Sequence, residues 1–253
     1  MGTGKDKMEQ CKFCTELKEL IDAHIIPKAF VRNKVKEYGN KNLVEVEKDK
    51  SGKEVRSNGY WDNHILCSSC DNVLGSCEKM LIEFLRNSND INKYNYRKIS
   101  LAIKGILWKA HITSNQEFKH IGLGKYGDKL YTSLKVSLSQ PNSMPSQDFP
   151  IWIQRYKNVL GNSHNKNDSI FNMINCGSKG RDPYYGTLYR FDFSGHQIII
   201  RVGGDPLPKT INRFITNDKS NIVEISYRFS STLEDIYKPK QSMLRAISQI
   251  TLY

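Results

Sequence analysis

The sequence lacks the features that would assign it to a membrane or to an export pathway. No apolar run among its 253 residues approaches the ~20 residues that span a bilayer. Residues 1–7 are polar and basic, with no apolar core behind them, so we expect no secretory signal. A myristoylation motif would have Ser or Thr where Asp6 stands. We therefore expect a cytoplasmic protein with reduced cysteines and no membrane partner.

Acidic residues are scarce relative to basic ones. Lys and Arg number 38 against 26 Asp and Glu, which gives a formal charge of +12 and a pI near 9.3. A positive field attracts polyanions, and nucleic acid is the commonest of these. We expect DNA as the partner, although the charge does not exclude RNA. A soluble protein from an organism rich in Lys and Asn would show the same excess.

Cysteines are few, but four of the six form two close pairs. Cys11-Lys-Phe-Cys14 and Cys67-Ser-Ser-Cys70 are separated by 52 residues. Each pair can bring two thiolates to one ion, and two pairs complete a tetrahedral Zn²⁺ site with no position left for water. Buried free cysteines would not explain the paired spacing. The sequence therefore predicts a structural zinc ion.

The chain divides by composition into two parts. Residues 1–85 hold five of the six cysteines, and residues 86–253 form the second part. Apolar spacing predicts strands and helices in both parts. In the first part we expect strands at 22–30, 43–46 and 64–67, then a helix at 71–85. In the second we expect helices at 96–112, 125–138 and 233–250, a loop at 140–148, and strands at 150–156, 188–193, 197–202 and 222–229. The second part is thus predicted to be an α+β domain with an antiparallel sheet that recognises a substrate or a partner.

Two further motifs lie between and after the cysteine pairs. His24-Ile-Ile-Pro27 follows the first pair, and Asp71-Asn72-Val-Leu-Gly-Ser-Cys-Glu78 follows the second directly. Together with the cysteines they resemble the zinc-containing branch of the HNH (ββα-metal) endonucleases, over about a third of the chain. The resemblance implies a zinc-braced hairpin and helix that grip one catalytic Mg²⁺ or Mn²⁺ ion. It also implies hydrolysis of DNA phosphodiester bonds.

The same resemblance implies roles for individual residues. His24 matches the family's general base, and Asp71 matches the last motif residue, which ligates the catalytic ion. Asn72 stands beside it. Asp62 occupies the place of the family's middle Asn, with Asn63 one position off, and His64 is a further candidate for the site.

One position departs from the family pattern. The residue before the catalytic His is usually Asp, Glu or His and binds the ion, but here it is Ala23. Either Asp71 holds the ion with another group, such as Asp62, His64 or Glu78, or the site is weakened. Glu78 lies about 10 Å along the helix from Asp71, so we expect it to orient Asp71 or brace the loop. Taken alone, His24 fits a structural role and Asp71 a helix N-cap.

These observations leave three functions open. The first is an HNH endonuclease, whose single site would nick one strand at a time and would need a homodimer or two events for double-strand cleavage. Its resemblance also suggests bacterial anti-phage defence, with a defence-system partner protein. The second is a non-catalytic zinc-ribbon-like protein that binds nucleic acid. The third is a protein-interaction subunit whose charge is incidental.

Two weaker patterns are set aside. Residues 122–127 match G-x-G-x-x-G, but no strand is expected before them, as a dinucleotide site requires. Tyr189, Phe191 and Phe193 could stack nucleobases, yet aromatic residues on strands more often pack in a core.

Overall fold

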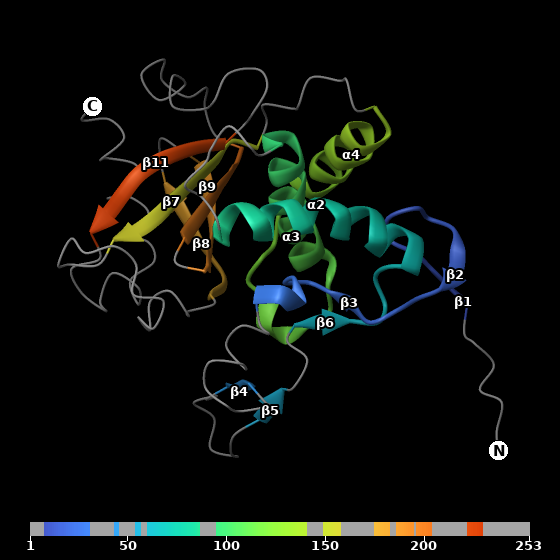
Figure 1. The fold of residues 1–253 in the computed structure, drawn as a ribbon. Helices are drawn as coiled ribbons and strands as arrows, with labels where there is room; N and C mark the ends of the chain where they lie inside the picture. The colour runs from blue at the N-terminus through green and yellow to red at the C-terminus, as the bar shows by residue number, and fades with distance from the viewer. Residues whose placement is uncertain are drawn as a thin grey trace.

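The computed structural model shows a mixed α+β chain with small antiparallel strand pairs, helices, and one larger sheet (Figure 1). The residues it describes are 8–30, 43–45, 54–56, 60–86, 95–140, 149–157, 175–182, 186–194, 196–203 and 222–229. The loop predicted at 140–148 lies outside them except for Gln140, and the helix predicted at 233–250 lies outside them entirely. Within these residues, no helix is long and apolar enough to cross a membrane.

Three two-stranded pairs form the N-terminal part. β1 (Met8–Gln10) pairs with β2 (Leu17–Glu19), β3 (Ala23–His24) with β6 (Trp61–Asp62), and β4 (Leu43–Glu45) with β5 (Glu54–Arg56), all antiparallel. The strand predicted at 43–46 is confirmed, and the one predicted at 22–30 is reduced to β3.

The strand predicted at 64–67 is wrong. Its place in the pairing is taken by β6, three residues earlier, and Cys67 makes only an isolated bridge with Leu20. The physical reason is a turn that the apolar pattern does not reveal. The Asp62 carboxylate accepts a hydrogen bond from the His64 backbone N–H at 2.8 Å, and this turns the chain immediately after β6.

The helices follow the sequence closely. α2 (Ser68–Arg86) begins three residues before its predicted start and buries an apolar stripe that includes Leu74, Leu81 and Phe84. α3 (Tyr96–Ile112) has the predicted bounds, because the Asn95 side chain caps it by accepting from the Lys98 N–H. α2 packs along α3. η2 (Gln116–Phe118) then leads to α4 (Tyr126–Ser139), which lies within one residue of its prediction.

The second half contains a five-stranded sheet in the order β11-β7-β10-β9-β8 (Figure 1). Its strands are β7 (Ile151–Lys157), β8 (Asn175–Asp182), β9 (Gly186–Phe193), β10 (His196–Val202) and β11 (Ile222–Phe229). Neighbours are antiparallel except β11, which runs parallel to β7. The predicted antiparallel sheet is therefore confirmed for four of these strands.

One hydrophobic core joins the helices to the sheet. It extends from Cys11 to Val202, and Phe30 stacks on Phe193 with ring centroids 4.8 Å apart. The aromatic residues of β9 that the sequence left between base stacking and packing, Tyr189, Phe191 and Phe193, are buried in this core. The core crosses residue 85 without a break, and a division of the chain at that residue stays a prediction.

Candidate metal centre and the polar contacts beside it

The first cysteine pair lies in the turn that joins β1 to β2. The Cys11 N–H donates to the Glu16 carbonyl at 2.9 Å, and the Thr15 N–H donates to the Cys11 carbonyl at 2.8 Å. Thr15 has a positive φ of 68°, which closes the turn tightly. These bonds fold the backbone so that Cys11 and Cys14 point to one side.

The second pair lies where α2 begins. Cys70 is in the first turn of the helix, and the Cys67 carbonyl accepts from the Asp71 N–H at 3.0 Å. The Cys67 N–H donates to Sγ of Cys11 at 3.4 Å, which joins the two cysteine pairs directly. The Ile21 N–H donates to the Leu66 carbonyl at 3.0 Å, which holds the two cysteine-bearing segments together.

The four sulfurs converge on one point. The Sγ atoms of Cys11, Cys14, Cys67 and Cys70 lie within 4.8 Å of one another, and those of Cys14 and Cys67 are 4.0 Å apart. A tetrahedral zinc ion with Zn–S bonds of about 2.3 Å separates its sulfurs by roughly 3.8 Å. The cluster therefore fits a structural Zn²⁺ site after small adjustments, as the spacing of the cysteines predicts.

The thiol pKa values show why this cluster suits a cation. Burial acts to raise the pKa of Cys67, but hydrogen bonds from the Ser69 hydroxyl and the Cys70 backbone lower it to about 6. Burial raises the pKa of Cys70, and its contact with Cys67 raises it further. One thiolate forms readily, whereas several so close together repel unless a metal ion lies between them.

His24 is held through its backbone by a buried ion pair. Nζ of Lys109, on α3, donates to the His24 carbonyl at 2.5 Å and to Oε1 of Glu78, on α2, at 2.6 Å. The side chains of Lys109 and Glu78 are 1% and 11% exposed. Lys109 thus links Glu78 to the strand that carries His24. The two roles predicted for Glu78, to orient Asp71 or to brace the loop, stay predictions. The His24 ring is half-buried, and its Nε2 atom is inaccessible to solvent.

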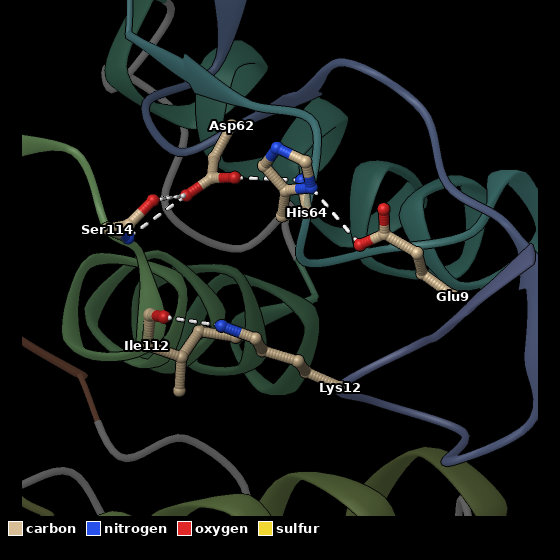
Figure 2. Close-up of polar contacts among 6 residues, drawn as sticks. All are labelled: Glu9, Lys12, Asp62, His64, Ile112 and Ser114. Atoms are coloured by element: carbon tan, nitrogen blue, oxygen red, sulfur yellow. Dashed lines mark hydrogen bonds and ion pairs between the residues drawn. The ribbon is translucent and has the colours of Figure 1, made fainter. Parts of the chain in front are cut away.

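Asp62 joins β6 to the end of α3. Its Oδ2 accepts a hydrogen bond from the Thr113 hydroxyl at 2.5 Å. Oδ2 also accepts from the Ser114 backbone N–H at 3.1 Å, while Oδ1 accepts from the His64 backbone N–H (Figure 2). Burial acts to raise the pKa of Asp62, but these hydrogen bonds outweigh it and hold the pKa below its ordinary value. The structure thus gives Asp62 a bracing role, and a part in catalysis stays a prediction.

The His64 side chain contacts the β1–β2 hairpin, which carries Cys11 and Cys14 in its turn. Its Nδ1 lies 3.1 Å from Oε2 of Glu9, on β1, and its side chain is 57% exposed (Figure 2). Beside it, Nζ of Lys12 donates to the carbonyl of Ile112 at 3.0 Å, at the end of α3. The two contacts tie the hairpin to β6 and to α3.

Asp71 and Asn72 lie in the first turn of α2, directly after the cysteine pair. Asp71 is half-buried and Asn72 is exposed. Asp71 is inside the helix rather than at its N-cap, because α2 begins at Ser68. Across the described ranges, the four cysteines are the one group of three or more Cys, His, Asp or Glu side chains close enough to share an ion. A catalytic ion held by Asp71 with fewer protein ligands stays a prediction.

Sequence reasoning missed Lys109, Thr113 and Ser114. Lys109 could have been found from the sequence, because it is a charged residue within the apolar stripe of the helix predicted at 96–112. A charge buried at such a position needs a partner. Thr113 and Ser114 gave none, since their partner Asp62 is more than 50 residues away.

Comparison with known proteins adds no relative. No family model, no curated protein and no solved structure matches this chain. The α+β architecture and the four-cysteine cluster are established by the structure, and the likeness to zinc-containing HNH endonucleases stays one of motifs and their spacing.

Zinc content tests the metal centre. We expect purified protein to hold about one zinc per chain, and Cys14→Ser or Cys70→Ser to lose the ion together with the folded state, because metal binding and folding are coupled in such sites. Elemental analysis and circular dichroism measure both. The control is Cys77→Ser, which removes a buried thiol of α2 outside the cluster and should keep the zinc. Zinc retained in the Cys14 and Cys70 variants would contradict the assignment.

The buried ion pair predicts a large coupling between the effects of Lys109 and Glu78 substitutions on the free energy of unfolding. Lys109→Met leaves the Glu78 carboxylate buried without its partner and should lower the free energy of unfolding by about 3–5 kcal/mol. The double variant Lys109→Met/Glu78→Leu should recover most of this loss, since it removes both charges. Urea unfolding gives the values, and Lys98→Met, at an exposed position of α3, is the control with little expected effect. Additive losses in the double variant would show that the pair does not interact.

Asp62 predicts a pH-dependent contribution to stability. Its pKa in the folded chain is below the ordinary 3.8, so its contribution is present above that pH and is lost as the pH falls through the folded value. Asp62→Asn should cost roughly 1.5–3 kcal/mol at pH 7 and progressively less below pH 3.8. Zinc loss in acid affects both proteins, so the difference between their unfolding free energies isolates the carboxylate. A pH-independent difference would contradict this account.

Proposed function

We propose that the chain is a metal-dependent endonuclease of the zinc-containing HNH type, which hydrolyses DNA phosphodiester bonds. The observation that carries the proposal is the order of elements around the cysteine cluster. Two short antiparallel strands, β3 and β6, are followed by α2. His24 lies on the first strand and Asp71 in the first turn of the helix. This is the strand–strand–helix order that the motif resemblance implies.

His24 is the proposed general base. An imidazole suits proton transfer near neutral pH. Because Nε2 is inaccessible to solvent, Nδ1 is the ring nitrogen that would take the proton from the attacking water. The bond from Lys109 to the His24 carbonyl fixes the backbone from which the ring projects. A fixed backbone is what positioning of a base requires.

Asp71 is the proposed ligand of a catalytic Mg²⁺ or Mn²⁺ ion. A carboxylate is the hard oxygen donor that these ions prefer, and Asn72 offers an amide oxygen beside it. Such an ion supplies stabilisation of negative charge on the phosphate and on the leaving oxygen. The charge of +12 favours binding to the DNA backbone. A role in anti-phage defence is part of the proposal and rests on the motif resemblance.

A second function has its own support in the structure. Ala23 is fully buried and lies directly opposite Asp62, and the Asp62 carboxylate is engaged by α3. The position that binds the ion in the family therefore has no ligand here. A zinc-ribbon-like protein that binds nucleic acid without cutting it accounts for the same residues.

Plasmid nicking separates the two functions. Supercoiled plasmid is incubated with the zinc-loaded protein and Mg²⁺, Mn²⁺ or EDTA, and nicked circles are quantified on gels. We expect metal-dependent nicking that falls by about 10²–10⁴-fold in His24→Ala, the usual contribution of a general base. Asp71→Asn should lower the nicking rate by a similar factor and should raise the concentration of Mg²⁺ or Mn²⁺ that nicking requires.

The control is His120→Ala, since His120 contacts the Gly177 carbonyl of β8 and lies outside the proposed site. Its nicking rate should match the wild type. Salt-dependent DNA binding with no nicking under any metal would favour the non-catalytic function. Equal activity of His24→Ala and the wild type would remove His24 from the mechanism.

A further inference from the structure

Trp61 is a large apolar side chain left in solvent beside the proposed catalytic residue. It is 40% exposed, and its backbone pairs directly with that of His24 in the β3–β6 register. Directly opposite residues on antiparallel strands project their side chains to the same face of the pair. The other pair, Ala23 and Asp62, faces the interior and is buried. His24 and Trp61 therefore share the outward face.

The backbone of Trp61 is held by hydrogen bonds on both sides. The Tyr60 carbonyl accepts from the Ile25 N–H at 2.9 Å, and the Trp61 carbonyl accepts from Nδ2 of Asn115 at 3.5 Å. Asp62 anchors the next position to the end of α3. Within the ranges that the structure describes, the indole takes part in no ring contact or hydrogen bond. A rigid strand thus presents an uncommitted aromatic face.

We propose that Trp61 is a stacking platform for an unpaired nucleobase of the nucleic acid that His24 acts on. The inference rests on the proposed function, which supplies nucleic acid as the substrate. It adds the form of nucleic acid that enters the site. An indole stacks on any base and gives no sequence preference. The formal net charge of +12 of the whole chain favours binding of a nucleic-acid strand, and the stacked base would set the phosphate beside it near His24.

The chemistry specifies an unpaired base. In a duplex both faces of a base are covered by its neighbours, so stacking on a side chain requires a single strand, an end or a base turned out of the helix. Stacking on an aromatic side chain contributes about 1–3 kcal/mol per base, which corresponds to a roughly 5- to 150-fold change in affinity. A single-stranded oligonucleotide should therefore bind more tightly than a duplex of the same length.

The three tryptophans allow a site-specific measurement. Trp108 and Trp152 are 3% and 1% exposed, so a nucleobase in contact with protein surface quenches Trp61 selectively. The zinc-loaded full-length protein is titrated with oligothymidylate, oligouridylate and a duplex of equal length, without Mg²⁺ or Mn²⁺. Tryptophan emission and the anisotropy of a fluorescein label on the oligonucleotide are followed together.

We expect oligothymidylate to quench emission in the wild type and not in Trp61→Leu, whose affinity should fall by roughly 5- to 150-fold. Trp61→Phe keeps an aromatic face and should lose less. Val136→Ala removes an exposed apolar side chain of α4 and is the matched control with unchanged affinity. Zinc content and melting temperature confirm that each variant folds. A preference for oligouridylate would identify RNA as the source of the base.

The outcomes separate this inference from the nuclease proposal. Quenching of the wild type together with weaker binding by Trp61→Leu would support stacking. If the wild type then nicks no plasmid, the nuclease proposal is rejected. Binding without quenching, equal affinity of Trp61→Leu and the wild type, or equal quenching by the duplex would overturn stacking, whatever the nicking assay shows. Failure to bind any of the three oligonucleotides would overturn it as well, and would favour a protein partner for this face.

Discussion

The convergence of four cysteine sulfurs is the constraint on which the N-terminal half depends. It joins a turn at residues 11–14 to the start of α2, although 56 positions separate Cys11 from Cys67. β3 and β6 contribute only two residues each, and so short a pair is not stable in water by itself. An ion that fixes the segments before β3 and after β6 reduces the conformational freedom that pairing would otherwise have to overcome. The cysteine site thus determines where His24 and Trp61 lie.

α3 supplies the second set of constraints, and these are polar. Lys109 reaches from its last turns to the His24 carbonyl and to Glu78, while Thr113 and Ser114 at its end hold Asp62. Buried charges cost free energy to desolvate, and apolar packing of the same volume would often be as stable. The ion pair adds geometric specificity. The hydrogen bonds of Lys109 to the His24 carbonyl and to the Glu78 carboxylate fix the position of β3 relative to α2 and α3. Both constraints therefore act on the same two-stranded pair.

The sequence predicted the elements whose signals are local. α3 was placed at its observed bounds from its apolar stripe, and β9 and β10 were placed from two apolar runs separated by a short turn at Ser194. The cysteine cluster was predictable because ligand spacing is itself a local signal. The strand at 64–67 was wrong because a hydrogen bond from the His64 backbone N–H to the Asp62 carboxylate turns the chain there, a feature that hydrophobic periodicity does not contain.

The remainder of the site depends on contacts between distant residues. The Lys109–Glu78 pair spans 31 positions, and the register that sets Trp61 opposite His24 joins positions 37 apart in the segment between the two cysteine pairs. Neither juxtaposition follows from a residue's neighbours in the chain. The sequence therefore indicated the four cysteines of the cluster, whereas the exposed face of Trp61 and the inward orientation of Asp62 required the tertiary structure.

The same register explains the departure at Ala23. Ala23 projects to the inner face of the β3–β6 pair, directly opposite Asp62, and is fully buried. An acidic residue there would place two carboxylates across from each other on adjacent strands, which is destabilising, and would bury a second charge without a cation. Because Asp62 is used to dock β6 on α3, position 23 must be small and uncharged. An ion beside His24 would therefore need ligands other than the side chain at position 23, and Asp71 in the first turn of α2 is the one proposed above.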